Sequence, residues 1–217
     1  MHSITRDLFS DCFGFTEGEV RKMLGCYNLD SKMDEVKDWY DGYLFGQKEI
    51  YNPWSVLKFL KDAKANPNVS CSAYWANTSS NAIVKDLVQN ADAETKDKIE
   101  TLINGGSVKA ELHEEIVYAD VKTKTDGIWN MLLLTGYLKP VKSEQIGESI
   151  VLDLVIPNRE VRSIYKNIIK DWFREEIKNP ESESGRLFEA LVSGNAEELQ
   201  SEINYWLEST ISYFNAK

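Results

Sequence analysis

Residues 39–55, WYDGYLFGQKEIYNPWS, constrain the fold more than any other part of the chain. This segment holds six aromatic residues, two glycines and one proline in seventeen positions. Gly42 suits the left-handed position after a helix, and Gly46 suits a tight turn. Asn52 followed by Pro53 is typical of a helix start, because proline lacks the N–H that the first turn leaves unused. The sequence therefore predicts a helix that ends before Gly42, a short hairpin around Gly46 and a second helix from Pro53.

The aromatic residues of this segment have two interpretations. In one, Tyr and Trp side chains face a ligand or a nucleotide, to which they offer stacking and hydrogen bonds. In the other, which we favour, they pack the corner between two helices, because caps and turn residues already explain the local pattern. The residues with a candidate interaction or architectural role are Trp39, Tyr40, Asp41, Gly42, Tyr43, Tyr51, Asn52, Pro53 and Trp54. A further alternative is an unfamiliar enzyme site near Asp38, Tyr40 and Asp41, which a deep pocket converging on them would support.

Helical periodicity recurs along the chain, and capping residues mark where several helices begin. Thr16 and Glu19 have the spacing of a capping box, and Asn158 precedes a strong apolar stripe. In the helix from Pro53, the predicted buried stripe consists of Trp54, Leu57, Phe59 and Leu60. In the last helix, the apolar side chains that need a covering surface are Ile203, Trp206, Leu207, Ile211 and Phe214.

Residues 79–156 predict the order helix, helix, strand, helix, strand, turn, strand. The third helix, TDGIWNMLLLTG, has Thr125 or Asp126 as its cap, and KSEQIGE is the predicted turn between the last two strands. This order resembles a winged helix, in which a β-hairpin closes a compact helical unit. The predicted fold is mainly α with small β-hairpins. A helical lid-like lobe (1–70) precedes a winged-helix-like lobe (71–157) and C-terminal helices (158–217).

Charge and composition argue against several classes of protein. The formal net charge is −10, whereas proteins that bind nucleic acid usually present a basic face to the phosphates. The chain has no run of about 18 apolar residues and no secretory signal pattern at its start, so we expect neither a membrane span nor secretion. Cys12, Cys26 and Cys71 are widely spaced and form no CxxC pair. We interpret them as reduced core thiols of a cytoplasmic protein.

The sequence lacks the motifs of common catalytic sites. It has neither a GxxxxGK[ST] phosphate loop nor a GxGxxG motif, and HEEIV at His113 lacks the second histidine of a zinc helix. Acid-x-Lys tripeptides, which magnesium nucleases place on strands, occur at 35–37, 120–122 and 176–178. Two of the three lie in predicted helices, the wrong context for such a site. We therefore expect no catalytic, cofactor-binding or metal-binding residues in this chain.

Several segments together resemble a known family of bacterial proteins. FGFTEGEV, WYDGYLFG, YNPWSVLKFL, YWANTSSNAIVKDLV, LLLTGYLK and IPNREVRSIYKNII occur in order over nearly the whole chain. They resemble AAA-ATPase-like proteins that carry a PD-(D/E)XK-nuclease-superfamily domain at the C-terminus. The resemblance implies a P-loop ATPase core, a helical and winged-helix-like middle and a nuclease-like domain, with this chain as the middle alone. No catalytic residue of the family is carried over, because no position here matches one.

The expected function is that of a non-catalytic regulatory and interaction segment. In ATPases of this general type, a lid closes over the nucleotide and passes that state to neighbouring domains. The expected partner is another protein or a second copy of the chain, with the absent ATPase and nuclease-like domains as candidates. The main alternative is a winged-helix-like DNA-binding module. Against it stand the acidic charge and the helix TDGIWNMLLLTG, which has no Lys or Arg.

Overall fold

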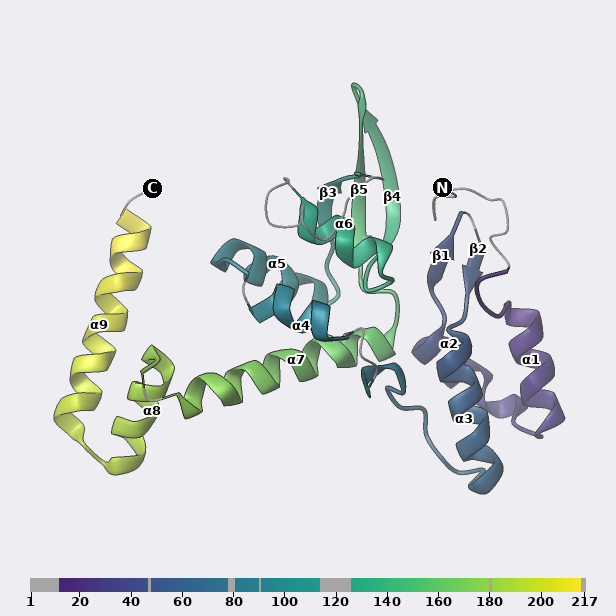
Figure 1. Cartoon of the computed structure of the whole chain (residues 1–217), viewed down its shortest axis with the longest axis horizontal. Helices are drawn as coiled ribbons and strands as arrows, with labels where there is room; N and C mark the ends of the chain where they lie inside the picture. Colours follow the sequence, from purple (N-terminus) through teal and green to yellow (C-terminus); the bar gives the residue numbers. More distant parts are fainter. Residues whose placement is uncertain are drawn as a thin grey trace. The chain divides into compact units, whose positions relative to one another are not determined.

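The protein is mainly α-helical, with two small antiparallel sheets, as the sequence predicts (Figure 1). A computed structural model describes residues 12–46, 48–77, 81–89, 91–113, 126–179 and 181–215. The chain divides into two compact units, residues 1–166 and 167–217, and α7 (Arg159–Lys178) crosses the division. The lobe boundaries proposed at residues 70 and 157 stay predictions.

The first helices of the chain begin and end where local sequence signals place them. Helix α1 (Glu17–Cys26) starts with the predicted capping box, in which the Glu19 carboxylate accepts from the Thr16 backbone N–H at 2.8 Å. After a 3-10 turn, η1 (Asp30–Lys32), helix α2 (Met33–Tyr40) runs to the first residues of the aromatic segment. Gly42 follows with φ +92°, the left-handed conformation expected there.

A short hairpin and a helix complete the predicted corner. Strands β1 (Tyr43–Phe45) and β2 (Lys48–Ile50) pair antiparallel, and Gly46 has φ +59°. Helix α3 (Pro53–Ala65) has Pro53 in its first turn, and the Asn52 side chain accepts from the Trp54 N–H at 3.0 Å. The hairpin and the helix start therefore confirm the sequence prediction.

The buried face of α3 differs from the prediction. Trp54 and Leu57 are 51% and 52% exposed. The buried side chains are instead Ser55, Val56, Phe59, Leu60 and Ala63. Val56, Phe59, Leu60 and Ala63 follow the spacing i, i+3, i+4, i+7, so they form one stripe that leaves Trp54 and Leu57 on its flanks. The Lys58 ammonium lies 4.6 Å from the centre of the Trp54 ring, which places this aromatic side chain in a surface contact.

Helices α1 to α3 and the segment after them share one hydrophobic core. Its buried members are Val20, Leu24, Leu29, Met33, Val36, Tyr40, Tyr51, Val56, Phe59, Leu60, Ala63 and Cys71. Cys71 is thus a core thiol, as predicted, but Cys12 and Cys26 are exposed, so the prediction of three core thiols is wrong. Cys26 is the last residue of α1, where the helix has passed beyond the core that Val20 and Leu24 enter.

The remainder of the first unit has the predicted order of elements within its described residues. Helices α4 (Asn81–Gln89) and α5 (Ala93–Ile103) precede β3 (Val108–Glu111), α6 (Gly127–Leu134), β4 (Lys139–Ile146) and β5 (Ser149–Val155). The sheet order is β3-β5-β4, all antiparallel. The predicted long turn KSEQIGE is wrong: most of it belongs to β4, and only Gly147 and Glu148 connect the two strands. Gly147 has φ +63°, as a two-residue hairpin turn requires.

The start of α6 depends on contacts that local sequence does not show. Asp126 precedes the helix in the left-handed conformation, and its side chain makes no capping bond. Its carboxylate accepts instead from the Glu111 N–H at 2.9 Å. Asn130, which is buried, donates to the carbonyls of Glu111 and Asp126 and accepts from the His113 N–H. The other predicted cap, Thr125, lies outside the described residues.

The second unit contains a helical hairpin. Helix α8 (Glu183–Ser193) is capped by Ser182 and ends at Gly194, and α9 (Ala196–Asn215) follows. The Arg186 guanidinium pairs with the Glu202 carboxylate at 3.0 Å. Large apolar side chains that remain exposed on this hairpin are Phe188, Leu191, Val192, Ile203, Tyr205 and Leu207. Within the described ranges, no helix combines the length and apolar character that a bilayer span requires.

Candidate functional site

The two most distinctive segments of the sequence, WYDGY (39–43) and PNRE (157–160), lie against each other. The Asn158 side-chain amide donates to the Asp41 carbonyl at 2.7 Å, across 117 residues of sequence. A Cβ on Gly42 would lie 2.6 Å from the Pro157 carbonyl oxygen, so only glycine allows this approach. We call this contact region the junction; it is a single feature built from both segments.

Asn158 performs two tasks in the junction. Its side-chain oxygen accepts from the Val161 N–H at 3.0 Å, which confirms it as the predicted cap of α7. Its amide nitrogen holds the Asp41 carbonyl at the end of α2. One buried side chain therefore caps α7 and ties its start to the backbone at the end of α2.

Asp38, Tyr40 and Asp41 contact different parts of the protein and do not converge on one site. Asp38 forms an exposed ion pair with Arg159 at 3.0 Å. The buried Tyr40 hydroxyl donates to the Ser72 carbonyl and accepts from the Ser72 N–H, both at 3.0 Å. Asp41 is buried, and its burial raises the pKa of its carboxyl group above the ordinary value. Asp38 and Tyr40 thus have separate polar partners, whereas one carboxylate oxygen of Asp41 is buried without a hydrogen bond.

A buried carboxylate beneath the junction was not predicted from the sequence. Glu160 is fully buried, and its two oxygens accept from the Ser55 hydroxyl at 2.8 and 2.7 Å. One of them also accepts a hydrogen bond from the backbone N–H of Trp75 at 2.9 Å. Burial raises the pKa of Glu160 from 4.5 to about 7, although these hydrogen bonds oppose the shift. Acids are common in the first turn of a helix, so nothing in the local sequence singled out Glu160.

A cluster of aromatic rings lies next to this carboxylate. The Trp75 ring stacks on Tyr137 with centroids 4.8 Å apart, and it meets the edge of Tyr43 at 6.0 Å. Tyr137 in turn meets Tyr165 at 6.3 Å. The Tyr43 hydroxyl is buried, and desolvation followed by the charge of Glu160 raises its pKa. Of the predicted aromatic residues, Tyr40 and Tyr51 belong to the core of α1 to α3, and Tyr43 packs against Trp75.

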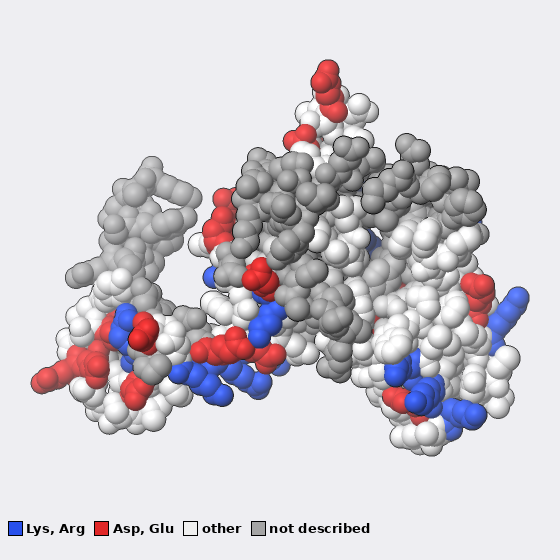
Figure 2. Space-filling model, viewed as in Figure 1, with Lys and Arg blue, Asp and Glu red and all other residues white. Residues whose placement is uncertain are grey.

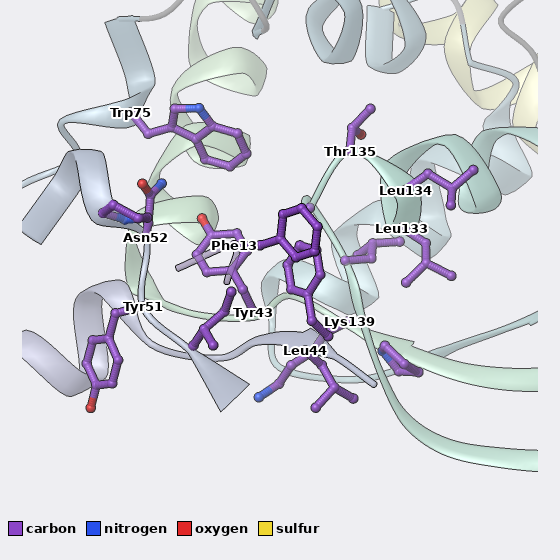
Figure 3. A pocket seen from close by; sticks show the side chains of 16 residues that line it. Phe13, Tyr43, Leu44, Tyr51, Asn52, Trp75, Leu133, Leu134, Thr135 and Lys139 are labelled. Carbon is purple, nitrogen blue, oxygen red and sulfur yellow. The ribbon is translucent and has the colours of Figure 1, made fainter. Parts of the chain in front are cut away.

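Two adjoining cavities open beside these rings. The first, of about 230 Å³, has Trp75 and Tyr43 on one side and the end of α6 at Thr135 on the other (Figure 3). Asn52, Pro53 and Tyr51 of the predicted set also line it. The second cavity, of about 390 Å³, shares Leu44, Leu133 and Pro140 with the first. Asp38, Tyr40 and Asp41 line neither cavity, so these hollows do not support the predicted alternative enzyme site.

The described residues offer little for metal chemistry. Among them, no three His, Cys, Asp or Glu side chains gather as a metal site would require. Glu35, from the tripeptide at 35–37, lies on α2 and pairs with Lys32 at 2.8 Å. The tripeptide at 120–122 and the side chain of Glu176 lie outside the described residues. The His113 backbone N–H donates a hydrogen bond to the side-chain oxygen of Asn130, which lies on α6.

Comparisons with known proteins return one distant relative. It is described as "Uncharacterized protein in vnfD 5'region" from Azotobacter chroococcum mcd 1 and is 22% identical over 193 residues. The matched region covers 89% of this chain and 34% of that protein, so the chain spans about a third of its relative's length. No family model matches the sequence, and no solved structure matches it.

Proposed function

We propose that the chain is a non-catalytic regulatory and interaction segment of an AAA-ATPase-like protein. The observation that carries the proposal is the junction. There, Asn158 bonds the Asp41 carbonyl at the end of α2, and Glu160 bonds the Ser55 hydroxyl of α3, so the start of α7 is held to both helices. Groups committed to such contacts transmit position between elements, which is what a regulatory segment requires.

In this proposal, the helices before residue 70 form a lid whose movement the junction passes to α7. A rigid packed contact transmits small displacements because packed interfaces shift between discrete arrangements. The relative supports a segment that works together with other domains, since the matched region covers only 34% of that protein. A cytoplasmic location and the absence of any cofactor belong to the same proposal.

Exposed apolar surface on the second unit supports a protein partner or self-association. On α8, Phe188, Leu191 and Val192 are 46%, 60% and 69% exposed. Leu191 and Val192 follow Phe188 by three and four positions, so they lie on the same side of the helix. Neighbouring large apolar side chains at such exposure are typical of surfaces that bind protein. ATPase and nuclease-like domains are the partners that the resemblance suggests.

The catalytic part of the proposal is tested with ATP hydrolysis and magnesium-dependent DNA cleavage by the purified chain. Both rates should equal those of the buffer and of an Asp41→Asn variant. Turnover that follows the protein through purification and falls in the variant would overturn the proposal.

The interaction part is tested by light scattering over a range of concentrations. Wild-type chain should show a mass that rises above 24.8 kDa as concentration rises, whereas a Leu191→Ser, Val192→Ser variant should remain at that mass. Binding of the dye ANS should fall in the same variant, because the dye reports exposed apolar surface. A monomer at every concentration, with dye binding equal to that of the variant, would contradict this surface assignment.

A DNA-binding role is the second candidate, because β4 and β5 form a projecting hairpin on a three-stranded sheet. Figure 2 shows acidic side chains at the end of this hairpin, where Glu144 and Glu148 lie. Acids at that position repel phosphates, and α6 carries no Lys or Arg to contact them. Fluorescence anisotropy with duplex and single-stranded DNA decides the matter: binding that weakens steeply with salt would favour this candidate over the first.

A further inference from the structure

Among the strands that the structure describes, β4 is paired on one side only. In the sheet order β3-β5-β4, β5 lies between the other two strands, so one edge of β4 is not paired within the sheet. The β1–β2 hairpin lies beside this edge (Figure 1). An unpaired edge presents a row of backbone donors and acceptors to any extended chain that reaches it.

The pairing register shows which residues of β4 present these groups. The Leu112 N–H donates to the Ile150 carbonyl, so Ile150 and the alternate residues of β5 direct their backbone groups toward β3. Val151 and Asp153 therefore direct theirs toward β4. Their partners there, opposite in the register, are Glu144 and Lys142. The intervening residues, Ser143 and Gln145, direct their N–H and C=O groups outward.

The larger cavity adjoins the part of β4 that precedes Glu144. Pro140, Val141, Lys142 and Ser143 all line it. These residues flank the irregularity between Pro140 and Lys142, where β4 departs from regular pairing, so the hollow borders the bulged part of the strand. The opposite wall consists of Leu44 and Gly46 from the β1–β2 hairpin. A groove thus runs between the hairpin and the edge of β4.

The walls of the groove are apolar and form two adjacent recesses. Leu112, Ile150 and Leu152 line the larger recess on the same side of the sheet as Ser143, whose register partner is Leu152. The smaller, aromatic recess adjoins it through Leu44, Leu133 and Pro140. Side chains on one face of an extended strand lie about 7 Å apart, a spacing that suits two neighbouring recesses.

We propose that the edge of β4 accepts an extended segment of a partner protein as an additional antiparallel strand. The segment hydrogen-bonds to Ser143 and Gln145 and places large apolar side chains, two positions apart, in the two recesses. Backbone bonds supply affinity in this mode of recognition, and the recesses supply specificity. The proposal rests on the interaction role proposed above and gives that role a second surface, distinct from α8.

A second copy of the chain fits the groove poorly. If β4 of another copy paired with this edge about Ser143, its Ser143 and Gln145 would lie on the recess side, because directly opposed residues share a face. Neither side chain fills an apolar hollow. The occupant is therefore a different sequence with aromatic or aliphatic residues at alternate positions.

The test uses hydrogen exchange and chemical shifts measured by NMR on the full chain. In the free protein, the amides of Ser143 and Gln145 should exchange fast, whereas those of Lys142 and Glu144 should be protected. The probe is the peptide acetyl-Thr-Thr-Phe-Thr-Leu-Thr-Thr-amide at up to about 1 mM, the range of weak recognition. On binding, exchange at Ser143 and Gln145 should slow by about tenfold or more. A peptide N-methylated at Phe and Leu, which keeps both side chains, should not bind.

Matched variants separate strand addition from side-chain docking. Ser143→Pro removes an outward N–H without removing a bond to β5, so the sheet should persist while peptide binding is lost. Ser143→Ala should bind as the wild type does. Absence of binding by the probe, binding unaffected by Ser143→Pro, or shifts in the recesses without slower exchange would each overturn the proposal. These measurements do not involve α8 or turnover, so their failure is distinct from failure of the proposed function.

Discussion

Replacement of Glu160 by glutamine should make the stability of the protein less dependent on pH. Glutamine has nearly the same shape, keeps an oxygen for the Trp75 N–H and can donate to the Ser55 hydroxyl. It carries no charge at any pH, whereas the buried Glu160 carboxyl titrates at about 7 in the folded state. The variant therefore isolates the cost of an unpaired charge in the interior.

The sign follows from the raised pKa. Below pH 4.5, Glu160 is protonated in the folded and unfolded states alike, and its contribution to stability is fully present. As pH rises toward 7, the unfolded chain releases the proton first, so the contribution falls. Each pH unit between the two values corresponds to about 1.4 kcal/mol. The loss is thus about 3 kcal/mol in total and about 2–3 kcal/mol between pH 5 and pH 8.

The assay is urea unfolding at pH 5 and pH 8, followed by circular dichroism. Glu160→Gln should gain about 2–3 kcal/mol relative to wild type between the two conditions. Other acids titrate equally in both proteins and cancel in the difference. Asp38→Asn, which alters an exposed ion pair of the same junction, is the control and should change by less than about 1 kcal/mol. A Glu160→Gln difference that stays constant within about 0.5 kcal/mol would refute the reasoning.

Three further substitutions, with Gly147→Ala as a control, test the junction and the corrected face of α3. Asn158→Ala should lower the free energy of unfolding by about 1–3 kcal/mol, because it removes a helix cap and leaves the buried Asp41 carbonyl without that donor. Gly42→Ala should cost more than about 2 kcal/mol in the same urea assay, whereas Gly147→Ala, which meets no neighbour, should cost about 1 kcal/mol. Trp54→Ala should change stability by less than about 1 kcal/mol, since the ring is half exposed; a loss above about 3 kcal/mol would restore the predicted core role.

Sequence reasoning succeeded where the determining interactions are local. The capping box at Thr16, the helix start at Asn52 and the end of α2 at Gly42 each depend on residues within a few positions. Turn and cap chemistry act over that range, so a single sequence contains them. The segment KSEQIGE shows the limit of local reasoning. Its polar residues predict a turn, but most of them belong to β4, an exposed strand at the edge of the sheet.

The parts that escaped prediction depend on distant partners. Glu160 accepts a hydrogen bond from Ser55, 105 residues away in the sequence. Asn130 donates a hydrogen bond to the Glu111 carbonyl, 19 residues away. Trp54 is a large aromatic residue and was therefore predicted to be buried. The face of α3 that is buried is instead the stripe from Val56 to Ala63. The candidate groove beside β4 was likewise out of reach, since it requires the strand order of the sheet.

The long separation between the two halves of the junction also has a consequence for synthesis on the ribosome. Ser55 leaves the exit tunnel 105 residues ahead of Glu160, which is roughly 5–20 s earlier at ordinary elongation rates. During that interval α2 and α3 lack Asn158 and Glu160, so the nascent helices expose the face that these residues later cover. The apolar core of α1 to α3 lies within residues 20–71, so only the buried polar contacts of Ser55 and of the Asp41 carbonyl wait for the later segment.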